Sequence, residues 1–346
     1  MFKLTKFSLL FLLFVLIFFI LIFLGIVFVK NLKPVSSDAT QIVLEIPEGA
    51  SFNEIISQLK EKGLIRQETV FKIFAILSGK AHQLKPGKYF LSKNLSAKEI
   101  INELTAGPKE VSITIIPGRT LKEIDEILAE NKIIKKGELI DLDVKEIFSV
   151  NPNKYFFLEG VKSLEGFLLP DTYYFLPGES IQSIVLKMVD NFSRKALPIF
   201  KQDGKLSTDR NFIYKTLILA SFLEKEVPVF EDQKIAAGVL EKRLTKGMPL
   251  QVDATILYAK CEGRFINCPA LTKEDFKINS VYNTYLFKGL TPTPISNPSI
   301  STIEAAANPV SSSFFYYLSI PKSTTTIFSK TLEEHNRYRF QYLLNN

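Results

Sequence analysis

Glu224 is the residue of this chain whose type and setting most suggest chemistry. It follows seven uncharged residues, 217–223, most of them large and apolar. A carboxyl group among hydrocarbon side chains favours its protonated form, because ionisation there costs solvation energy. Such an acid can give its proton to a leaving group near neutral pH, as the cleavage of a glycosidic bond requires. Lys225 and Glu226 follow directly, so the alternative is a solvated helix end, the commoner setting for a glutamate.

The residues around Glu224 predict a helix over residues 211–227. Ala220 and Ser221 lie one turn before Glu224 and therefore share its face of this helix. Both side chains are small, so this face leaves room for a bulky ligand; a helix that packs through its small residues is the alternative. Glu226 lies only two positions further along and would face away, so the helix supplies no second carboxylate beside Glu224.

Residues 7–29 form an apolar segment that predicts where the chain resides. The segment has no charged residue and consists almost entirely of Phe, Leu, Ile and Val, and a helix of this length crosses a bilayer. A signal peptide would have a shorter apolar region and a small-residue cleavage site, so we expect an uncleaved single-pass anchor. Lysines flank the segment on both sides, and the free amino terminus favours a cytoplasmic tail at residues 1–6 and an external main domain.

The net charge of +7 raises the possibility of a nucleic-acid partner. Four of these charges belong to the lysines that flank the anchor, and residues 1–37 contain no Asp, Glu or Arg, which leaves +3 for the rest of the chain. A nucleic-acid-binding domain would have a dense basic patch. We therefore expect no nucleic-acid partner.

Cys261 and Cys268 are the only cysteines of the chain, and neither of its two histidines is nearby. A zinc site would need more ligands than these residues supply, so no metal is expected. If the domain lies outside the cytoplasm, a disulfide that closes a local loop is the favoured reading; two free thiols are the alternative.

A strand, a turn and a capped helix recur along the chain. Capping boxes, in which a hydroxyl and a carboxylate satisfy the free N–H groups of a helix start, are predicted at Ser51 with Glu54, Ser96 with Glu99 and Thr120 with Glu123. With a further strand at residues 87–91, residues 41–108 predict a small α+β unit after a polar linker at residues 30–40. Its strand–helix–helix–strand order resembles LysM modules, which bind N-acetylglucosamine polymers; a spacer is the alternative. Residues 109–346 predict a mixed α/β domain, so the whole chain is assigned to the α+β class.

The segment that carries Glu224 also resembles a known family. Residues 220–226, Ala-Ser-Phe-Leu-Glu-Lys-Glu, are similar to the catalytic signature of the endolytic murein transglycosylases, the YceG-like family. The resemblance spans about residues 41–340 and consists of several motifs in the family's order and spacing. Together these motifs are far more specific than any one of them. The other matching segments are residues 164–173, 243–244, 247–255, 258, 282–285, 289–298, 305–309, 328 and 334–336.

Two short segments depart from the family pattern. Residues 289–295 read Gly-Leu-Thr-Pro-Thr-Pro-Ile, whereas family members usually have Gly-Leu-Pro-Pro-Gly-Pro-Ile, and residues 241–244 read Glu-Lys-Arg-Leu where Asn-Arg-Leu is usual. These differences bear on the shape of one substrate-lining loop and not on the acid.

The resemblance implies a lyase, a peptidoglycan lytic transglycosylase. Such an enzyme would cleave the bond between N-acetylmuramic acid and N-acetylglucosamine inside nascent glycan strands, leave a 1,6-anhydro end and limit strand elongation. Ordinary glycosidases need two carboxylates, whereas here the 6-hydroxyl of the muramic acid is the nucleophile and one carboxylate suffices. The family pattern places this acid at Glu224, and no cofactor is implied.

The remaining calls concern substrate contacts, partners and location. Amide, hydroxyl and ring groups suit sugars, and the candidate contacts are Glu165, Ser221, Gln251, Asp253, Tyr282, Asn283, Thr284 and Tyr285. The expected partners are peptidoglycan strands, the membrane and proteins of wall synthesis, and the expected location is the bacterial plasma membrane with the catalytic domain outside. The alternative function is a non-catalytic, membrane-anchored protein of the same fold that binds or scaffolds peptidoglycan.

Overall fold

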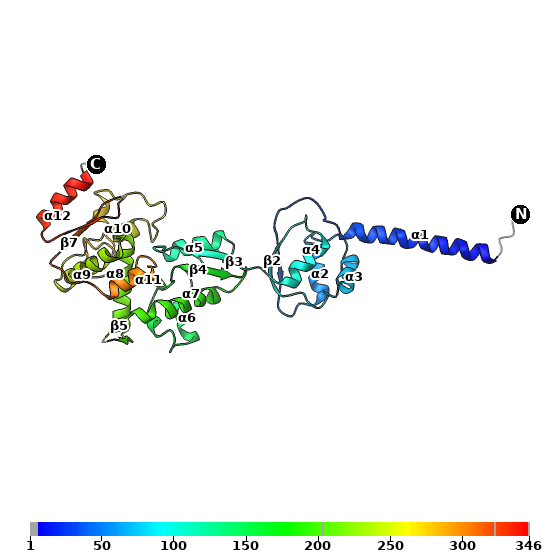
Figure 1. Cartoon of the computed structure of the whole chain (residues 1–346), viewed down its shortest axis with the longest axis horizontal. Helices are drawn as coiled ribbons and strands as arrows, with labels where there is room; N and C mark the ends of the chain where they lie inside the picture. Colours follow the sequence, from blue (N-terminus) through cyan, green and yellow to red (C-terminus); the bar gives the residue numbers. More distant parts are fainter. Residues whose placement is uncertain (1–5, 203, 322, 345–346) are drawn as a thin grey trace. The chain divides into compact units, whose positions relative to one another are not determined.

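The structure is a computed structural model that describes residues 6–202, 204–321 and 323–344. Of the predicted tail at residues 1–6, all but Lys6 lies outside the described residues. The chain divides into two compact units (Figure 1). The first contains the chain up to Val111 together with Leu176–Gly178, and the second contains Ser112–Phe175 and the chain from Glu179 onward.

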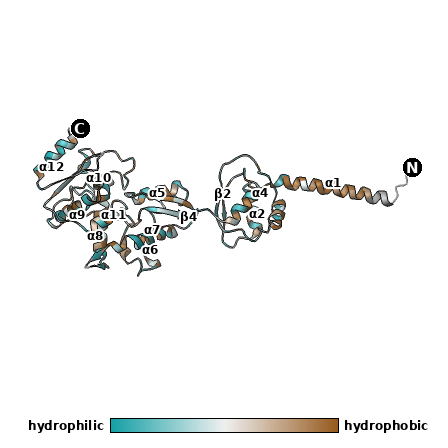
Figure 2. Cartoon of the chain, in the orientation of Figure 1, coloured by the Kyte–Doolittle hydropathy of each residue, from teal (hydrophilic) through white to brown (hydrophobic). Residues whose placement is uncertain are grey.

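Helix α1 (Lys6–Leu32) contains the predicted anchor. Its stretch Phe11–Leu32 is long and apolar enough to cross a membrane, and none of it is fully buried by the protein; Figure 2 colours most residues of this helix as hydrophobic. A helix that is apolar on all sides and exposed along most of its length is the pattern expected of a membrane span.

The rest of the first unit is a small α+β module. Its elements are β1 (Ile42–Ile46), α2 (Phe52–Glu61), α3 (Glu68–Leu77), β2 (Gly87–Leu91) and α4 (Ala97–Ala106). Strands β1 and β2 pair antiparallel, with Ile42 opposite Leu91 and Ile46 opposite Gly87. Alternate strand residues such as Leu44 and Tyr89 point into a core that the inner faces of the three helices complete. The predicted strand at residues 87–91 is confirmed.

The predicted capping boxes are confirmed, and they define where three helices begin. In α2, α4 and α5 (Leu121–Glu130) the cap hydroxyl accepts from the third backbone N–H, while the glutamate there accepts from the backbone N–H of the cap residue. Each box satisfies N–H groups that lack partners inside the helix.

The second unit is mostly helical. After β3 (Val111–Ile115) and α5 it contains α6 (Val144–Val150), η1 (Phe156–Leu158), β4 (Asp171–Phe175), α7 (Ile181–Lys195), η2 (Leu197–Ile199), β5 (Lys201–Gln202), β6 (Lys205–Leu206), α8 (Arg210–Glu226), α9 (Phe230–Thr245), α10 (Asp253–Lys260), η3 (Asp275–Lys277), α11 (Ile300–Ala307), β7 (Tyr316–Ser319), β8 (Thr326–Ser329), α12 (Leu332–Arg339) and η4 (Phe340–Leu344). Among the described residues every sheet has two strands: β3 pairs with β4, β5 with β6 and β7 with β8.

Helix α8 is the central element of this unit. Helices α9, α10 and α11 all pack against it, and the run from Thr216 to Leu223 is buried without a break. Its bounds agree within a residue with the helix predicted at residues 211–227. The glutamates in the last turn of α8 follow this buried run directly, so they emerge at the edge of the core.

Candidate active site

Glu224 and Glu226 leave the last turn of α8 on different sides. Two positions along an α-helix correspond to a rotation of about 200°, so their carboxyl groups meet different parts of the second unit. Glu226 lines a cavity of about 290 Å³, and Glu224 is not among its lining residues. The two carboxyl groups therefore have different capacities for chemistry.

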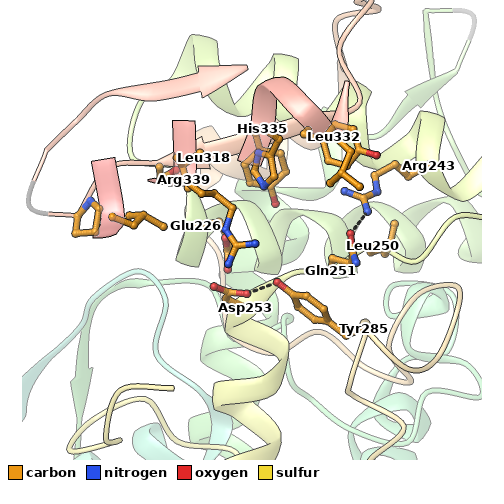
Figure 3. A pocket seen from close by; sticks show the side chains of 15 residues that line it. Glu226, Arg243, Leu250, Gln251, Asp253, Tyr285, Leu318, Leu332, His335 and Arg339 are labelled. Atoms are coloured by element: carbon orange, nitrogen blue, oxygen red, sulfur yellow. Dashed lines mark hydrogen bonds between the residues drawn. The ribbon is translucent and has the colours of Figure 1, made fainter. Parts of the chain in front are cut away.

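The cavity beside Glu226 is formed by α8, α9, the start of α10, the β7–β8 hairpin and α12 (Figure 3). Polar and aromatic side chains dominate its walls. Its lining residues are Glu226, Arg243, Leu250, Gln251, Asp253, Tyr285, Tyr316, Tyr317, Leu318, Ser319, Pro321, Leu332, His335, Arg339 and Leu343. Aromatic rings and hydrogen-bonding groups of this kind suit a carbohydrate ligand.

Glu226 has the electrostatic setting of an acid that holds its proton. Its partly buried carboxyl group has a pKa raised to about 7, chiefly because burial removes water and also because Asp253 adds a nearby negative charge. The opposing contribution is a hydrogen bond from the backbone N–H of Ala254 to Oε1, at 2.8 Å. A carboxyl group with a pKa near neutrality can both donate and accept a proton at physiological pH.

Asp253 is exposed, and Tyr285 holds it in place. The hydroxyl of Tyr285 donates to Oδ1 of Asp253 at 2.5 Å (Figure 3). Burial raises the pKa of Tyr285 far above its usual range, with the charge of Asp253 as a further cause. Tyr285 therefore remains a proton donor in this bond and holds Asp253 beside Glu226.

Gln251 lines the cavity, and Thr284 holds its backbone in place. Gln251 has a φ of 56°, a left-handed conformation that strains a residue with a side chain. Thr284 holds this backbone, because its carbonyl accepts from the N–H of Gln251 at 3.1 Å and its hydroxyl accepts from the N–H of Val252 at 2.9 Å. Asn283 supports the same segment by donating to the carbonyls of Phe276 and Ile278.

Basic side chains form the opposite wall of the cavity. Arg243 is buried, and it donates to the carbonyl of Pro249 at 2.9 Å and to Oε1 of Gln251 at 2.5 Å. His335 stacks on Tyr316, with ring centroids 5.2 Å apart, and burial lowers its pKa, as do Arg339 and Arg243. Arg339 is exposed at the rim, without an ion pair to any described residue. An anionic ligand group would find positive charge on this wall.

The carboxyl group of Glu224 binds the start of the neighbouring helix, α11. Its Oε2 accepts from the backbone N–H and the hydroxyl of Ser299, both at 2.9 Å, and from the hydroxyl of Thr302 at 2.6 Å. Ser299 is the N-cap of α11. A carboxylate at a helix N-terminus is stabilising, because it meets free N–H groups and the positive end of the helix dipole. Glu224 thus fastens α11 to α8.

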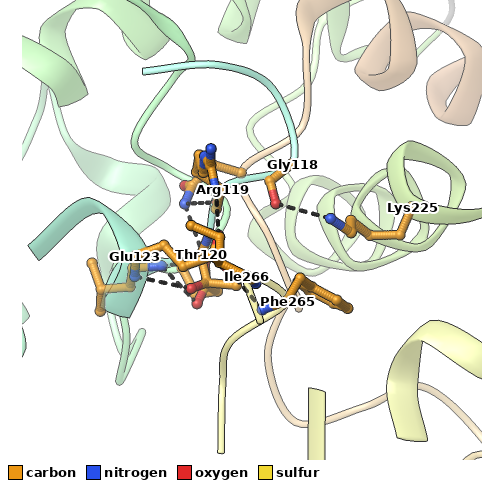
Figure 4. Close-up of polar contacts among 10 residues, drawn as sticks. Gly118, Arg119, Thr120, Glu123, Lys225, Phe265 and Ile266 are labelled. Atoms are coloured by element: carbon orange, nitrogen blue, oxygen red, sulfur yellow. Dashed lines mark hydrogen bonds and ion pairs between the residues drawn. The ribbon is translucent and has the colours of Figure 1, made fainter. Parts of the chain in front are cut away.

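The loops around Glu224 approach it closely. Gly118 has a φ of 77°, and a Cβ there would lie 3.6 Å from Cγ of Glu224 and 3.4 Å from Cδ of Lys225, so this turn favours glycine. Lys225 donates to the carbonyl of Gly118 at 3.4 Å (Figure 4), and its ammonium lies 3.9 Å from the ring centroid of Phe265. Burial lowers the pKa of Lys225.

Asn297 connects three of these segments. Its Oδ1 accepts from the N–H groups of Gly166 and Leu168, both at 2.9 Å. Its amide group donates to the carbonyl of Arg119 and to Oε1 of Glu165, each at 3.0 Å. All four hydrogen-bonding positions of this buried side chain are filled, which fixes the loops relative to one another.

Glu165 and Glu123 are buried beneath the same loops, at 2% and 1% exposure. Glu165 accepts from the N–H of Leu121 and the hydroxyl of Tyr258, and burial raises its pKa to about 8. Glu123 accepts from the N–H groups of Phe265 and Ile266 at 2.6 and 2.7 Å (Figure 4). Both carboxyl groups thereby organise loops.

The loop held by Glu123 is closed by a disulfide. Cys261 and Cys268 are bonded, with Cα atoms 5.9 Å apart. The bond restricts the segment whose N–H groups reach Glu123, so the disulfide and the carboxylate position the same loop.

The structure separates the predicted substrate contacts into two groups. Gln251, Asp253 and Tyr285 line the cavity. The others lie outside it: Ser221 is fully buried and accepts from the N–H of Ile295, and the hydroxyl of Tyr282 shares a hydrogen bond with Thr293. Glu165, Asn283 and Thr284 are likewise buried and bonded internally. In this structure these five residues shape the second unit from within.

Comparison with known proteins places the chain in a family. A family model described as the YceG-like family matches residues 44–341. The chain belongs to the YceG-like family. Among solved structures, a crystal structure of a YceG-like protein from Listeria monocytogenes is similar, with a TM-score of 0.56 and 32% identity, and the match covers 86% of this chain and 99% of that one.

Two curated relatives give this YceG-like chain a functional context. An endolytic murein transglycosylase of Bacillus subtilis (strain 168) is 33% identical over 325 residues, which cover 90% of this chain and 88% of the relative. One of Streptococcus pneumoniae serotype 2 (strain D39 / NCTC 7466) is 28% identical over 356 residues. That match covers 96% of this chain but only 64% of the longer streptococcal protein.

Several cavity residues of this YceG-like protein were not among the predicted site residues. Glu226 was read as facing away, and the helical spacing that separated it from Glu224 was correct; what lies on its side of α8 could not be read from the helix. Arg243, Tyr316, Tyr317, His335 and Arg339 reach the cavity from α9, β7 and α12. The signal that could have found some of them is the family-like segments at residues 243–244 and 334–336.

Proposed function

We propose that this chain is a peptidoglycan lytic transglycosylase, a lyase that cuts glycan strands in their interior. It would cleave the bond between N-acetylmuramic acid and N-acetylglucosamine and leave a 1,6-anhydro end, which limits the length of nascent strands. Membership of the YceG-like family and curated relatives that carry the name endolytic murein transglycosylase support this activity. The observation on this chain that carries the proposal is a carboxyl group with a pKa of about 7 in a polar and aromatic cavity.

We assign the acid to Glu226 rather than to Glu224. Glu226 lines the cavity with three of the predicted sugar contacts, and its surroundings raise its pKa to about 7, so that a large share of the carboxyl groups is protonated at neutral pH. Glu224 has one carboxylate oxygen committed to three donors from Ser299 and Thr302. A proton donor needs a free approach to the glycosidic oxygen, and the setting of Glu226 offers that approach.

The reaction then needs one carboxyl group in two successive roles. The protonated Glu226 gives its proton to the glycosidic oxygen as the bond to the anomeric carbon of N-acetylmuramic acid breaks, and the N-acetylglucosamine part leaves as an alcohol. The resulting carboxylate takes the proton of the muramic acid 6-hydroxyl while that oxygen bonds to the anomeric carbon. The anhydro ring closes without water, and Glu226 is protonated again.

Asp253 makes a second mechanism, hydrolysis with two carboxyl groups, worth testing, because its carboxylate lies beside the proposed acid. In hydrolytic glycosidases a second carboxylate acts as nucleophile or activates water. We favour a supporting role, since Tyr285 donates to Asp253 and the charge of Asp253 contributes to the raised pKa of Glu226. The products separate the two mechanisms: hydrolysis leaves reducing ends and transglycosylation leaves anhydro ends.

The first unit would hold the enzyme at its substrate. Helix α1 supplies a single membrane anchor, and the module at residues 41–108 resembles a LysM module, which would bind glycan. With a short cytoplasmic amino terminus, the second unit would lie outside the plasma membrane, where nascent strands and the proteins that synthesise them are located. An external location also suits a disulfide between Cys261 and Cys268.

The experiment that tests this proposal is digestion of purified sacculi by the full chain in detergent, followed by mass spectrometry of the released glycans. We expect internal fragments with anhydro ends. Reducing ends would indicate hydrolysis with Asp253 as a partner. Binding to sacculi without any release of fragments would indicate the alternative function, a non-catalytic scaffold.

A further inference from the structure

The helix α3 carries an exposed apolar face that the proposed enzyme activity does not use. Outside α1, the described part of the first unit exposes four large apolar side chains, and three of them lie on α3: Ile73, Ile76 and Leu77, with exposures of 44%, 62% and 75%. Positions i, i+3 and i+4 share one face of a helix. The other face of α3 is already occupied, since Phe71 and Ala75 are buried in the module core.

The location of this face suggests what covers it. Helix α3 packs beside α1, and Figure 1 shows it next to the end of α1 that enters the module. Arg66, just before α3, donates to the carbonyls of Pro34 at 2.6 Å and Val35 at 3.0 Å, which directly follow α1. The residue before α3 is thereby fastened to the short segment that follows the end of α1.

Basic residues surround the same region. A groove of about 700 Å³ is lined by Ile22, Gly25, Ile26, Val29, Lys30, Lys33 and Arg66. It has apolar walls where α1 is apolar and positive charge at its outer end, and Lys30, Lys33 and Arg66 form no ion pair with a described residue. Apolar side chains beside unpaired basic ones are the pattern of helices that lie in the headgroup region of an anionic bilayer.

We propose that the face of α3 formed by Ile73, Ile76 and Leu77 inserts into the outer interface of the bilayer that α1 crosses. The occupant is the lipid itself, with anionic headgroups at Lys30, Lys33 and Arg66. The module would then rest on the membrane with a defined orientation instead of moving freely on a linker. This inference rests on the proposed anchoring by α1.

Fluorescence can test this contact, because the chain has no tryptophan. Three single variants of the full chain, Leu77→Trp, Phe18→Trp and Val43→Trp, would be reconstituted in vesicles of equal parts phosphatidylcholine and phosphatidylglycerol. Part of the phosphatidylcholine would be brominated, near the carbonyl end of its chains in one set of vesicles to probe Leu77→Trp and Val43→Trp, and near the chain ends in a second set to probe Phe18→Trp at the middle of the bilayer. Val43 is the matched control, an apolar residue of β1 that is 39% exposed, and Phe18 lies within α1.

We expect the brominated lipid to quench Leu77→Trp about twofold and to leave Val43→Trp unchanged, since bromine quenches only a ring at the level of the lipid. Quenching of Phe18→Trp but not of Leu77→Trp would overturn this inference and leave the anchor intact. Absence of quenching for Phe18→Trp would overturn the anchor as well. A blue-shifted but unquenched Leu77→Trp would indicate that a protein, such as a second copy, covers the face, and would also overturn the proposal.

Discussion

The last turn of α8 carries two glutamates, Glu224 and Glu226, and their carboxyl groups have different surroundings. On one side, Glu224 accepts three hydrogen bonds from Ser299 and Thr302 and joins two helices. On the other, Glu226 faces a cavity, and burial together with Asp253 raises its pKa to about 7. Two carboxyl groups two residues apart therefore have different surroundings, and the proposed mechanism gives proton transfer to Glu226. The segments that close over a residue decide its chemistry more than its neighbours in sequence do.

Of the substitutions that test this comparison, Glu226→Gln should have the largest effect on activity. The amide cannot donate an acidic proton or act as a base, so the rate of anhydro-end formation should fall by about a thousandfold. The substitution keeps the size of the side chain and the acceptor for the N–H of Ala254. Mass-spectrometric assay of sacculus digests would measure the loss, and circular dichroism would check that the fold is retained.

Glu224→Ala should affect stability instead of the chemical step. The donors of Ser299 and Thr302 would lose their shared acceptor, at a cost of roughly 2–3 kcal/mol in the free energy of unfolding. Urea unfolding of the full chain in detergent would measure this cost. Activity per folded molecule should remain within a few fold of the wild type. If Glu224→Gln abolished activity in a folded protein while Glu226→Gln did not, the assignment of the acid would return to Glu224.

Asp253→Asn should shift the pH profile of the enzyme. Activity needs protonated Glu226, so the wild-type rate is expected to fall as the pH rises through a pKa of about 7. Loss of the negative charge of Asp253 lowers this pKa, which moves the alkaline limb to lower pH by roughly one unit and reduces activity above neutrality by about tenfold. The pH dependence of kcat would show the shift. A profile that moves to higher pH, or does not move, would contradict the coupling of the two carboxyl groups.

Thr302→Val should have the smallest effect on stability, and it tests a single hydrogen bond, the one from the hydroxyl of Thr302 to Glu224. The variant removes one hydroxyl donor to Glu224 and leaves Ser299 in place, so we expect a loss of about 1 kcal/mol in the free energy of unfolding. Comparison with Glu224→Ala would show whether Ser299 and Thr302 act independently. Any change in the pH profile would indicate that Glu224 also influences the cavity.

The elements of this fold could be predicted well because their signals are local. Capping boxes at Ser51, Ser96 and Thr120 fix helix starts through contacts three residues apart, and the uninterrupted apolar segment at residues 7–29 specifies α1. The extent of the sheets could not be predicted in the same way. Residues 109–346 alternate strands and helices, yet their described strands pair only two by two.

The site was harder to predict because it is made of distant segments. The sequence places Glu224 and Glu226 on opposite sides of a helix. Which side faces a cavity and which packs against another helix depends on α12 and α11, which lie far along the chain. The apolar run before Glu224 is part of the buried stretch of α8, and the prediction that Glu224 is the acid rests on that run and on the family resemblance. Gln251, Asp253 and Tyr285 were predicted as sugar contacts from their types and the family-like segments, and they line the cavity, whereas Arg339 carries no local signal.

Asn297 has a consequence for how the protein ages. Asparagine side chains deamidate when the backbone nitrogen of the next residue attacks the side-chain carbonyl to form a cyclic imide. Here the next residue is Pro298, whose ring nitrogen carries no hydrogen and is already fully substituted. The amide that connects these loops thus stands at a position chemically resistant to conversion into aspartate.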